Sequence, residues 1–479
     1  MSNQELLALL PLITLSGAIL VQMMAIAFFR DLQRTVAISL ISLFLTALAF
    51  VPVHSIIPIS VTPLIQLDGF ALYFSGLLLF SAAAVTLLSY DYLKDRGERP
   101  DEFFILLLLS TLGALVLVSS THFASFMLGL ELLGVSLYTM MSYPHRGLFT
   151  LEAALKYLIL SGVSSTFILF GAALIYAIQG TLEFSGLSAM TPVGAEQLIL
   201  LTGATMIFAG LMFKLSLAPF HMWTPDVYEG APAPVTAYIA TISKASIFAL
   251  TLRLFASSNM IESIPLLTAL SFIAIISILG GNLLALRQDN IKRLLAYSSI
   301  AHIGYLLVAF IAAGVSGGES LAIEATCYFL FAYILTTLGA FGVVSIVSIP
   351  NHDHDATDIS SYEGLFWRQP ALAAMFTAML LSLAGIPLTV GFIGKFYIFA
   401  AGVESDLWLL IAIVIMGSAI GIFYYLRIIF AMTRRTDNET TVEIPVAGGC
   451  VMFVVTAALI IFGVYPTPVI SLISNLALM

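Results

Sequence analysis

About fourteen stretches of predominantly apolar residues follow one another along this chain of 479 residues. A helix needs about 20 such residues to cross roughly 30 Å of hydrocarbon. Because the stretches are continuous rather than alternating, and backbone groups cannot stay unpaired in lipid, we expect helices and not barrel strands. Their approximate limits are 4–29, 35–56, 69–89, 103–119, 121–143, 153–178, 197–220, 232–256, 262–286, 295–314, 322–348, 370–400, 406–433 and 446–474.

The composition excludes a soluble fold of this length. Hydrophobic residues make up 60% of the chain and charged residues 9%, and the mean hydropathy is +1.06. Soluble domains carry about 25% charged residues. The first stretch has no basic leader and no small-residue cleavage site, so we expect a retained helix rather than a signal peptide. The sequence therefore predicts an all-α polytopic membrane protein with about 14 transmembrane helices.

The basic residues predict the orientation of the chain in the membrane. Links that follow odd-numbered spans hold twelve of the 18 basic residues, and on the opposite side only Arg253 is found. Positive charge stays cytoplasmic, so both termini should face outward, which means the periplasm in a double-membraned bacterium. The twelve are Arg30, Arg34, Lys94, Arg96, Arg99, Arg146, Arg287, Lys292, Arg293, Arg368, Arg434 and Arg435.

No metal or redox cofactor site is predicted on this chain. Cys327 and Cys450 each lie in an apolar stretch, and we interpret them as small core residues rather than a disulfide or metal pair. The polar run Asn351-His352-Asp353-His354-Asp355 is interpreted as a solvated loop rather than a metal site. The four thiolates of an iron–sulfur cluster and a Gly-rich nucleotide turn are both missing. Lipid and protein partners are expected, and nucleic acid is not.

Five ionisable side chains fall inside predicted spans. Each costs about 2.5–3.5 kcal/mol at the centre of a bilayer. They can be structural ion pairs or lysines that reach an interface, or they can mark a proton route. Fixed pairing cannot neutralise four lysines with one carboxylate, which favours the proton route. The five are Glu131, Lys156, Lys214, Lys244 and Lys395, and Lys156 is the weakest candidate because it lies only a few residues into its span.

A carboxylate beside a lysine holds the proton on the amine. Glu131 and Lys214 are therefore expected to form an electrostatic switch, in which their separation lets the lysine discharge. His221 and His302 are candidate proton relays, because histidine titrates near neutral pH. The alternative for each is a buried histidine hydrogen-bonded to a carbonyl group.

Two predicted spans are interrupted by proline and glycine. The seventh contains Pro219, and the twelfth contains Gly385, Pro387 and Gly391. Paired interruptions in corresponding positions point to a transport site between repeats, although ordinary proline kinks are an alternative. They lie five spans apart in opposite directions, which predicts two inverted five-helix repeats, each with a discontinuous helix. The expected divisions are 1–100 (three helices), 101–256 (first repeat), 257–433 (second repeat) and 434–479 (C-terminal helix).

Three runs carry a family resemblance, namely Phe213–Val235 (FKLSLAPFHMWTPDVYEGAPAPV), Asn290–Tyr305 (NIKRLLAYSSIAHIGY) and Gly391–Phe396 (GFIGKF). Together they resemble the antiporter-like proton-pumping subunits of respiratory complex I, the NADH:quinone oxidoreductase, and the related multisubunit cation/proton antiporters. The N-type subunit fits best. The chain stops soon after its fourteenth span, unlike the L-type, and it has Lys395 where the M-type typically has glutamate.

The resemblance implies roles for the candidate residues and for the subunit. Electrons would pass from NADH through FMN and iron–sulfur clusters to quinone in other subunits, with no cofactor on this chain. The subunit would lie between the M-type and K-type membrane subunits and move protons from cytoplasm to periplasm. The implied proton-translocating residues are Glu131 and Lys214 as an ion pair, Lys156, the central Lys244, Lys395 near the periplasmic exit, and His221 and His302 on the hydrophilic axis.

Two other functions stay open at this point. The chain can instead be a subunit of a stand-alone sodium/proton antiporter, which shares the same motifs. It can also be a non-pumping subunit that only completes a membrane assembly, although the row of lysines argues against this.

Overall fold

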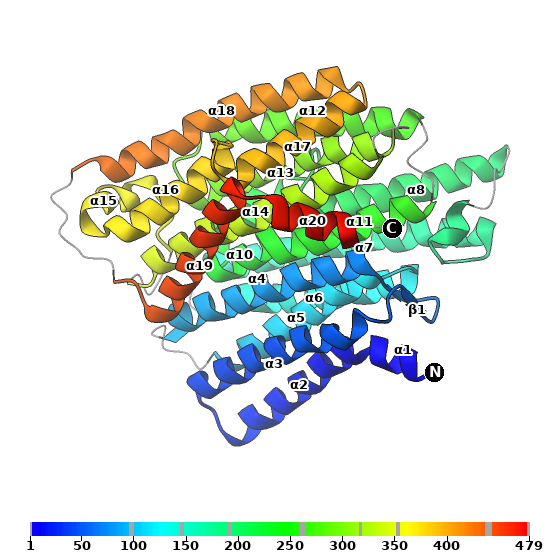
Figure 1. Ribbon diagram of the computed structural model, residues 1–479, viewed down its shortest axis with the longest axis horizontal. Helices are drawn as coiled ribbons and strands as arrows, with labels where there is room; N and C mark the ends of the chain where they lie inside the picture. Colours follow the sequence, from blue (N-terminus) through cyan, green and yellow to red (C-terminus); the bar gives the residue numbers. More distant parts are fainter. Residues whose placement is uncertain are drawn as a thin grey trace.

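The computed structural model describes residues 2–94, 100–143, 148–188, 194–258, 264–315, 319–350, 355–435 and 443–476. Long helices lie side by side through the molecule, as Figure 1 shows. A short antiparallel hairpin, β1 (Ile59–Val61) and β2 (Ile65–Leu67), lies at the same end as the N-terminus. The all-α polytopic fold predicted from the sequence is confirmed, and the hairpin was not predicted.

The helices follow the predicted apolar stretches closely. Their bounds are α1 Asn3–Ala8, α2 Leu10–Phe28, α3 Leu32–Val53, α4 Gly69–Lys94, α5 Asp101–Ser119, α6 Phe123–Ser142, α7 Leu148–Gln179, α8 Ala195–Lys214, α9 Trp223–Gly230, α10 Ala233–Tyr238, α11 Lys244–Ser258, α12 Ile264–Ala285, α13 Ile291–Ala313, α14 Glu319–Ser348, α15 Leu365–Arg368, α16 Pro370–Ala384, α17 Val390–Glu404, α18 Trp408–Thr433, α19 Val446–Val464 and α20 Thr467–Leu476. The π-helical turn η2 (Ile239–Ser243) joins α10 to α11.

In the described part of the chain, 13 helical segments are long and apolar enough to cross a membrane. The sequence predicted about fourteen spans, and the difference lies in the twelfth. That span consists of α16 and α17, each of 15 residues, so neither crosses alone by length. A helix of 15 residues is only about 22 Å long.

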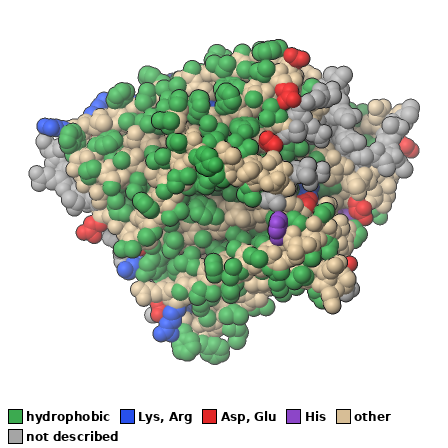
Figure 2. Space-filling view, in the orientation of Figure 1, with side chains coloured by type: hydrophobic (Ala, Val, Ile, Leu, Met, Phe, Trp, Pro, Cys, Tyr) green, Lys and Arg blue, Asp and Glu red, His purple; other side chains and the backbone are tan. Residues whose placement is uncertain are grey.

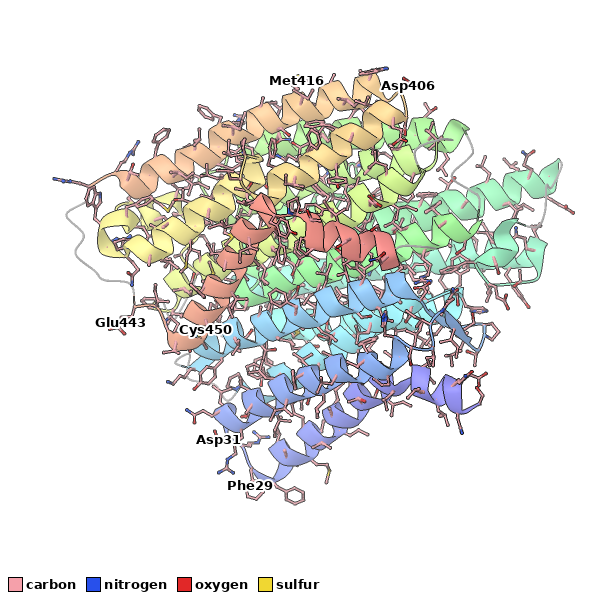
Figure 3. The ribbon with its side chains drawn as sticks, in the orientation of Figure 1. Phe29, Asp31, Asp406, Met416, Glu443 and Cys450 are labelled. Carbon is pink, nitrogen blue, oxygen red and sulfur yellow. The ribbon has the colours of Figure 1, made fainter. Side chains whose placement is uncertain are left out.

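Successive links alternate between the two ends of the molecule. Figure 3 places Asp31 and Glu443, which belong to links after odd-numbered spans, at one end, and Asp406, after the twelfth span, at the other. Both chain termini, marked in Figure 1, lie toward the end at which Figure 3 labels Asp406. This arrangement agrees with an even number of membrane crossings.

The outer surface is apolar and the most buried helices lie at the centre. Figure 2 shows hydrophobic side chains over most of the visible face, with the visible basic side chains gathered toward the left-hand end. By contrast, the spanning segments Ala233–Ser257, Ile291–Ala313 and Leu321–Ser348 are fully buried. The polar residues of these three segments are therefore shielded from lipid by the rest of the protein.

Both predicted helix breaks are present. The seventh span stops at the end of α8 and resumes at α9, and Ser216 between them has a positive φ of 64°. The twelfth stops at the end of α16 and resumes at α17, with Gly385 at φ 84°. Discontinuous helices at these two places are thus confirmed. The division into two inverted five-helix repeats stays a prediction.

The prediction that both cysteines are small core residues is right for one of them. Cys327 is buried in α14, as expected of a small core residue, but Cys450 is exposed on α19. Both are free thiols. The reading of Cys450 was wrong because an apolar stretch in a membrane protein has a lipid-facing side as well as a core side.

Candidate functional site

Four lysine side chains of the described residues are buried inside the helical assembly, and three of them are predicted site residues. The exposed fractions are 3% for Lys214, 1% for Lys244 and 5% for Lys395. Among the described residues, no carboxylate forms an ion pair with any of the three; the buried ion pairs involve other basic residues. Each amine is instead held by neutral oxygen atoms. The sequence predicted these three to lie inside membrane spans, and the structure buries all three among the helices.

The Lys214 amine lies at the end of α8, where the helix breaks. Its Nζ atom donates a hydrogen bond to the Ser161 hydroxyl of α7. Ser161 in turn shares a hydrogen bond of 2.6 Å with the Tyr138 hydroxyl of α6. The amine therefore ends a chain of hydroxyl groups that crosses three helices.

Glu131 and Lys214 are not joined by an ion pair in this structure, although each is described. Glu131 is partly buried on α6, two turns before Tyr138, and its Oε1 atom is buried without a hydrogen-bond partner in the described part of the chain. The two groups are close enough to interact electrostatically. In this structure the amine of Lys214 donates its hydrogen bond to Ser161 and not to Glu131, and the expected switch stays a prediction.

Lys244 occupies the centre of the molecule, directly after the π-helical turn η2. Its Nζ atom donates to the Ser299 hydroxyl of α13 over 2.6 Å. Ser299 also lies 2.6 Å from the Tyr333 hydroxyl of α14, and the amine sits over the Tyr228 ring at 5.5 Å. A π-bulge widens a helix locally and is frequent at functional sites. Sequence reasoning did not predict this turn, and no Gly or Pro marks it.

Lys395 uses the break in the twelfth span. Its Nζ atom donates to the carbonyls of Leu383 and Ala384, both over 3.0 Å, and lies 5.3 Å from the Tyr305 ring centre. These carbonyls are free because the last turn of a helix has no intrahelical donors for them. The partial negative charge of that helix end also favours a cation. The break therefore supplies the groups that hold the amine.

The two candidate histidines lie in different surroundings. His302 is 5% exposed, packs against the Phe329 ring at 5.9 Å and shares a 3.3 Å contact between Nε2 and the Tyr425 hydroxyl. His221 is partly buried just before α9, and its Nδ1 atom is buried without a hydrogen-bond partner among the described residues. The structure brings His302 into the central row, whereas His221 stays at the break.

Tyr157 connects the surroundings of Lys214 with those of Lys244. Its ring lies 5.3 Å from the Tyr138 ring, and its hydroxyl lies beside Ser243, the residue before Lys244. Hydroxyl residues that extend the row were not predicted as site residues. Serine and tyrosine are frequent in membrane helices, so only their spacing relative to the charged residues could have identified them. These residues are Tyr138, Tyr157, Ser161, Tyr333 and Tyr425.

Lys156 lies apart from the buried row. Its side chain is 41% exposed and pairs with Glu152 at 2.8 Å and with Asp226 of α9 at 2.9 Å. No contact of Lys156 with Ser161 or Lys214 is present. The structure therefore places the weakest of the five candidates in a peripheral group of charges.

Two further buried ion pairs were not predicted. Arg253 forms two hydrogen bonds with the Asp68 carboxylate, at 2.7 and 2.8 Å. Lys292 pairs with Asp355 at 2.7 Å, and the Tyr92 hydroxyl donates to the same carboxylate over 2.6 Å. The reading of Asp355 as part of a solvated loop is therefore wrong, because a buried lysine requires it as a partner. Residues 351–354 of that run lie outside the described residues.

No group of three or more His, Cys, Asp and Glu side chains that could hold a metal ion occurs in the described ranges. The site is thus a row of amines, hydroxyls and one histidine. Such groups can accept and donate protons.

The chain is similar to known membrane subunits over its full length. The sequence profile of the family "NADH:quinone oxidoreductase/Mrp antiporter, TM" matches residues 120–421. A relative from Ectopseudomonas mendocina (strain ymp), NADH-quinone oxidoreductase subunit N, is 47% identical, with 99% of this chain and 97% of the relative covered. The subunit N of Methylococcus capsulatus is 46% identical, with 99% and 96% covered.

Solved structures give the same result. A chain of respiratory complex I from Thermus thermophilus with bound aureothin has a TM-score of 0.82 and 30% identity, with 96% of this chain and 98% of that chain covered. A chain of the Mrp complex from Dietzia sp. DQ12-45-1b also has a TM-score of 0.82, with 99% and 97% covered, but only 18% identity, so it shows the fold alone.

Proposed function

We propose a proton path for this chain. The chain belongs to the NADH:quinone oxidoreductase/Mrp antiporter family and, within it, to the subunit N branch. It is an antiporter-like membrane subunit of the NADH-quinone oxidoreductase complex. Protons cross it along the row Lys214, Lys244 and Lys395, while NADH oxidation and quinone reduction, with FMN and iron–sulfur clusters, take place in other subunits.

One observation carries this proposal: three buried amines have neutral partners. A buried charge costs several kcal/mol unless it is paired, and a fixed carboxylate would hold a proton permanently on its lysine. Hydroxyl and carbonyl oxygens accept a hydrogen bond from the amine in either protonation state. Each lysine of the row can therefore gain and lose a proton without leaving a carboxylate unpaired.

Glu131 and Lys214 form the gate at one end of the row. When the Glu131 carboxylate contacts the Lys214 amine, the proton stays on the lysine. When the two are apart, as here, the amine donates to Ser161 and the proton can move on through Tyr138, Tyr157 and Ser243 toward Lys244.

The second half of the row continues from Lys244 through Ser299 and Tyr333. His302 and Tyr425 lie next along α13 and α18 and relay the proton toward Lys395. Lys395 at the second helix break is the last amine before the exit. His221, at the first break, is a relay on the entry side.

The proposal also includes the direction of proton movement and the neighbouring subunits. The excess of basic residues in the links after odd-numbered spans favours a cytoplasmic position for that end. The chain then lies in the bacterial inner membrane with both termini in the periplasm, and protons move from cytoplasm to periplasm. Its neighbours in the membrane arm are the M-type and K-type subunits.

The test is Lys244→Met in the assembled complex, reconstituted into vesicles. We expect the number of protons that this subunit translocates per NADH oxidised to fall about tenfold or more. Positioned acid–base groups contribute about 10²–10⁴-fold to proton transfer. Lys94→Met is the matched control, since Lys94 is exposed at the end of α4, and this variant should pump normally.

Two outcomes would contradict the proposal. If Lys214→Ala, Lys244→Ala and Lys395→Ala all assembled and pumped with the normal stoichiometry, the chain would be a structural subunit. If deletion of the chain abolished sodium tolerance but left NADH-dependent quinone reduction intact, it would be a cation/proton antiporter subunit.

A further inference from the structure

The peripheral charges around Lys156 form a connected network, which begins with the pairing of Lys156 and Glu152 at 2.8 Å. Asp226 lies between two cations: its Oδ2 atom is 2.9 Å from Lys156 Nζ, and its Oδ1 atom is 2.9 Å from Arg293. Arg293 also binds Glu229 over 2.8 Å, and Asn290 donates to the other oxygen of Glu229 over 2.9 Å. Both oxygens of both α9 carboxylates are therefore satisfied.

The network joins three elements that are far apart in sequence. Lys156 belongs to α7, Asp226 and Glu229 to α9, and Arg293 to the first turn of α13. It thus connects the predicted first five-helix repeat with the second. The short helix α9 lies between the other two and carries the carboxylates.

The network lies beside exposed apolar side chains. The neighbouring α7 side chains Phe149, Leu151 and Leu155 are 75%, 52% and 48% exposed. Apolar side chains offer no hydrogen bonds to an ion, so the charges beside them depend on one another as partners. Exposed ion pairs in water contribute little, but charges beside hydrocarbon need their partners.

Backbone packing fixes α9 at the same place. A Cβ atom on Gly230 would lie 2.6 Å from the Phe149 carbonyl oxygen and 2.7 Å from Ala153 Cβ, so the end of α9 touches α7 directly. On the other side, Lys292 donates to the Ala231 carbonyl, the C-cap of α9, over 2.5 Å. Helix α9 is therefore held from both α7 and α13.

The position of α9 matters for the buried row. Tyr228 of α9 places its ring 5.5 Å from the Lys244 amine. Trp223, at the start of α9, stacks on Phe213 and lies 4.8 Å from the Tyr157 ring. A shift of α9 would change the surroundings of both Lys244 and Tyr157.

We propose that Lys156 is a positioning residue that, with Asp226 and Arg293, clamps α9 between the two halves of the chain, and that it does not itself carry protons. The inference rests on the proposed proton path for its link to pumping. It assigns the sixth-span lysine a role different from the one that the family resemblance implies.

The experiment compares Lys156→Arg with Lys156→Met in the assembled complex in vesicles. Arginine keeps the charge and the ion pair but stays protonated in proteins. Under the clamp, Lys156→Arg keeps more than about half of the wild-type proton uptake per NADH, whereas Lys156→Met loses about threefold or more.

Hydrogen–deuterium exchange in the same complexes measures how firmly α9 is held, independently of pumping. The amides of residues 223–230 should exchange faster in Lys156→Met than in the wild type, and normally in Lys156→Arg. Equal loss of pumping in both single variants, or unchanged exchange in Lys156→Met, would overturn the clamp. Lys244→Met, prepared in the same way, tests only the proton path. Normal pumping by Lys244→Met would contradict the path, whereas the Lys156 variants test the clamp.

Discussion

At the scale of the residue, the partner of each buried amine decides what the amine can do. Lys214 and Lys244 each donate to a serine hydroxyl, Ser161 and Ser299. By contrast, the buried Arg253 and Lys292 each hold a carboxylate. The first arrangement leaves the proton free to move, and the second fixes the charge as a structural link.

Ser161→Ala tests this difference. The Lys214 amine would lose its acceptor and the connection to Tyr138, and a hydrogen bond to a charged group contributes about 1.5–3 kcal/mol. We expect proton pumping to fall about tenfold or more, with assembly unchanged. The control is Ser165→Ala, one turn further on α7, since the Ser165 hydroxyl is buried without a hydrogen-bond partner in the described ranges. A pumping rate equal to that of the control would exclude Ser161 from the path.

A site residue could be predicted from the sequence where its side-chain type differs from that of its sequence neighbours. A lysine in an apolar stretch is conspicuous, so Lys214, Lys244 and Lys395 could be identified from the sequence. Ser161 and Tyr157 could not, because most hydroxyl groups of membrane helices only bond to the preceding turn, as Ser81 does. Long-range pairs were missed for a different reason: Arg253 and Asp68 are 185 positions apart, and no local pattern joins them.

At the scale of the element, the helix breaks provide polar groups inside an apolar protein. The end of α16 offers two carbonyls to Lys395, and Gly385 makes the turn possible with its positive φ of 84°. Proline and glycine in the sequence predicted this break and the one after α8. The π-helical turn η2 has no such signal, because Ile239–Ser243 contains neither proline nor glycine.

Gly385→Ala should therefore impair the second break. An alanine in the left-handed region costs about 1–2 kcal/mol, and its Cβ would lie 2.8 Å from Lys395 Cδ. The lysine must then move away from its carbonyls, and we expect proton uptake per NADH to decrease. Gly280→Ala on α12 is the control, because its Cβ would meet nothing within 4 Å. Normal pumping by Gly385→Ala in complexes that assemble like the control would mean that Lys395 does not need this turn.

At the scale of the whole molecule, the order of the helices and their alternation across the membrane could be predicted, because length and hydropathy determine them. Their mutual packing could not. Asp355 shows why, because it is 63 positions from Lys292 in the sequence and still pairs with it. Only the assembled fold brings this loop residue and its buried partner together. The predicted sidedness, which sets the direction of proton movement, depends on the basic links alone.

Thiol labelling can determine that sidedness. Phe29→Cys lies in the link between α2 and α3, and Glu404→Cys lies at the end of α17; both wild-type side chains are exposed. In a background with Cys450→Ser, a membrane-impermeant maleimide should label Glu404→Cys from the periplasmic side of intact cells. It should reach Phe29→Cys only in inverted vesicles, because the neighbouring Arg30 and Arg34 favour the cytoplasm. The opposite pattern would place both termini in the cytoplasm and reverse the entry and exit of the row, so that Lys395 would lie near the cytoplasmic end.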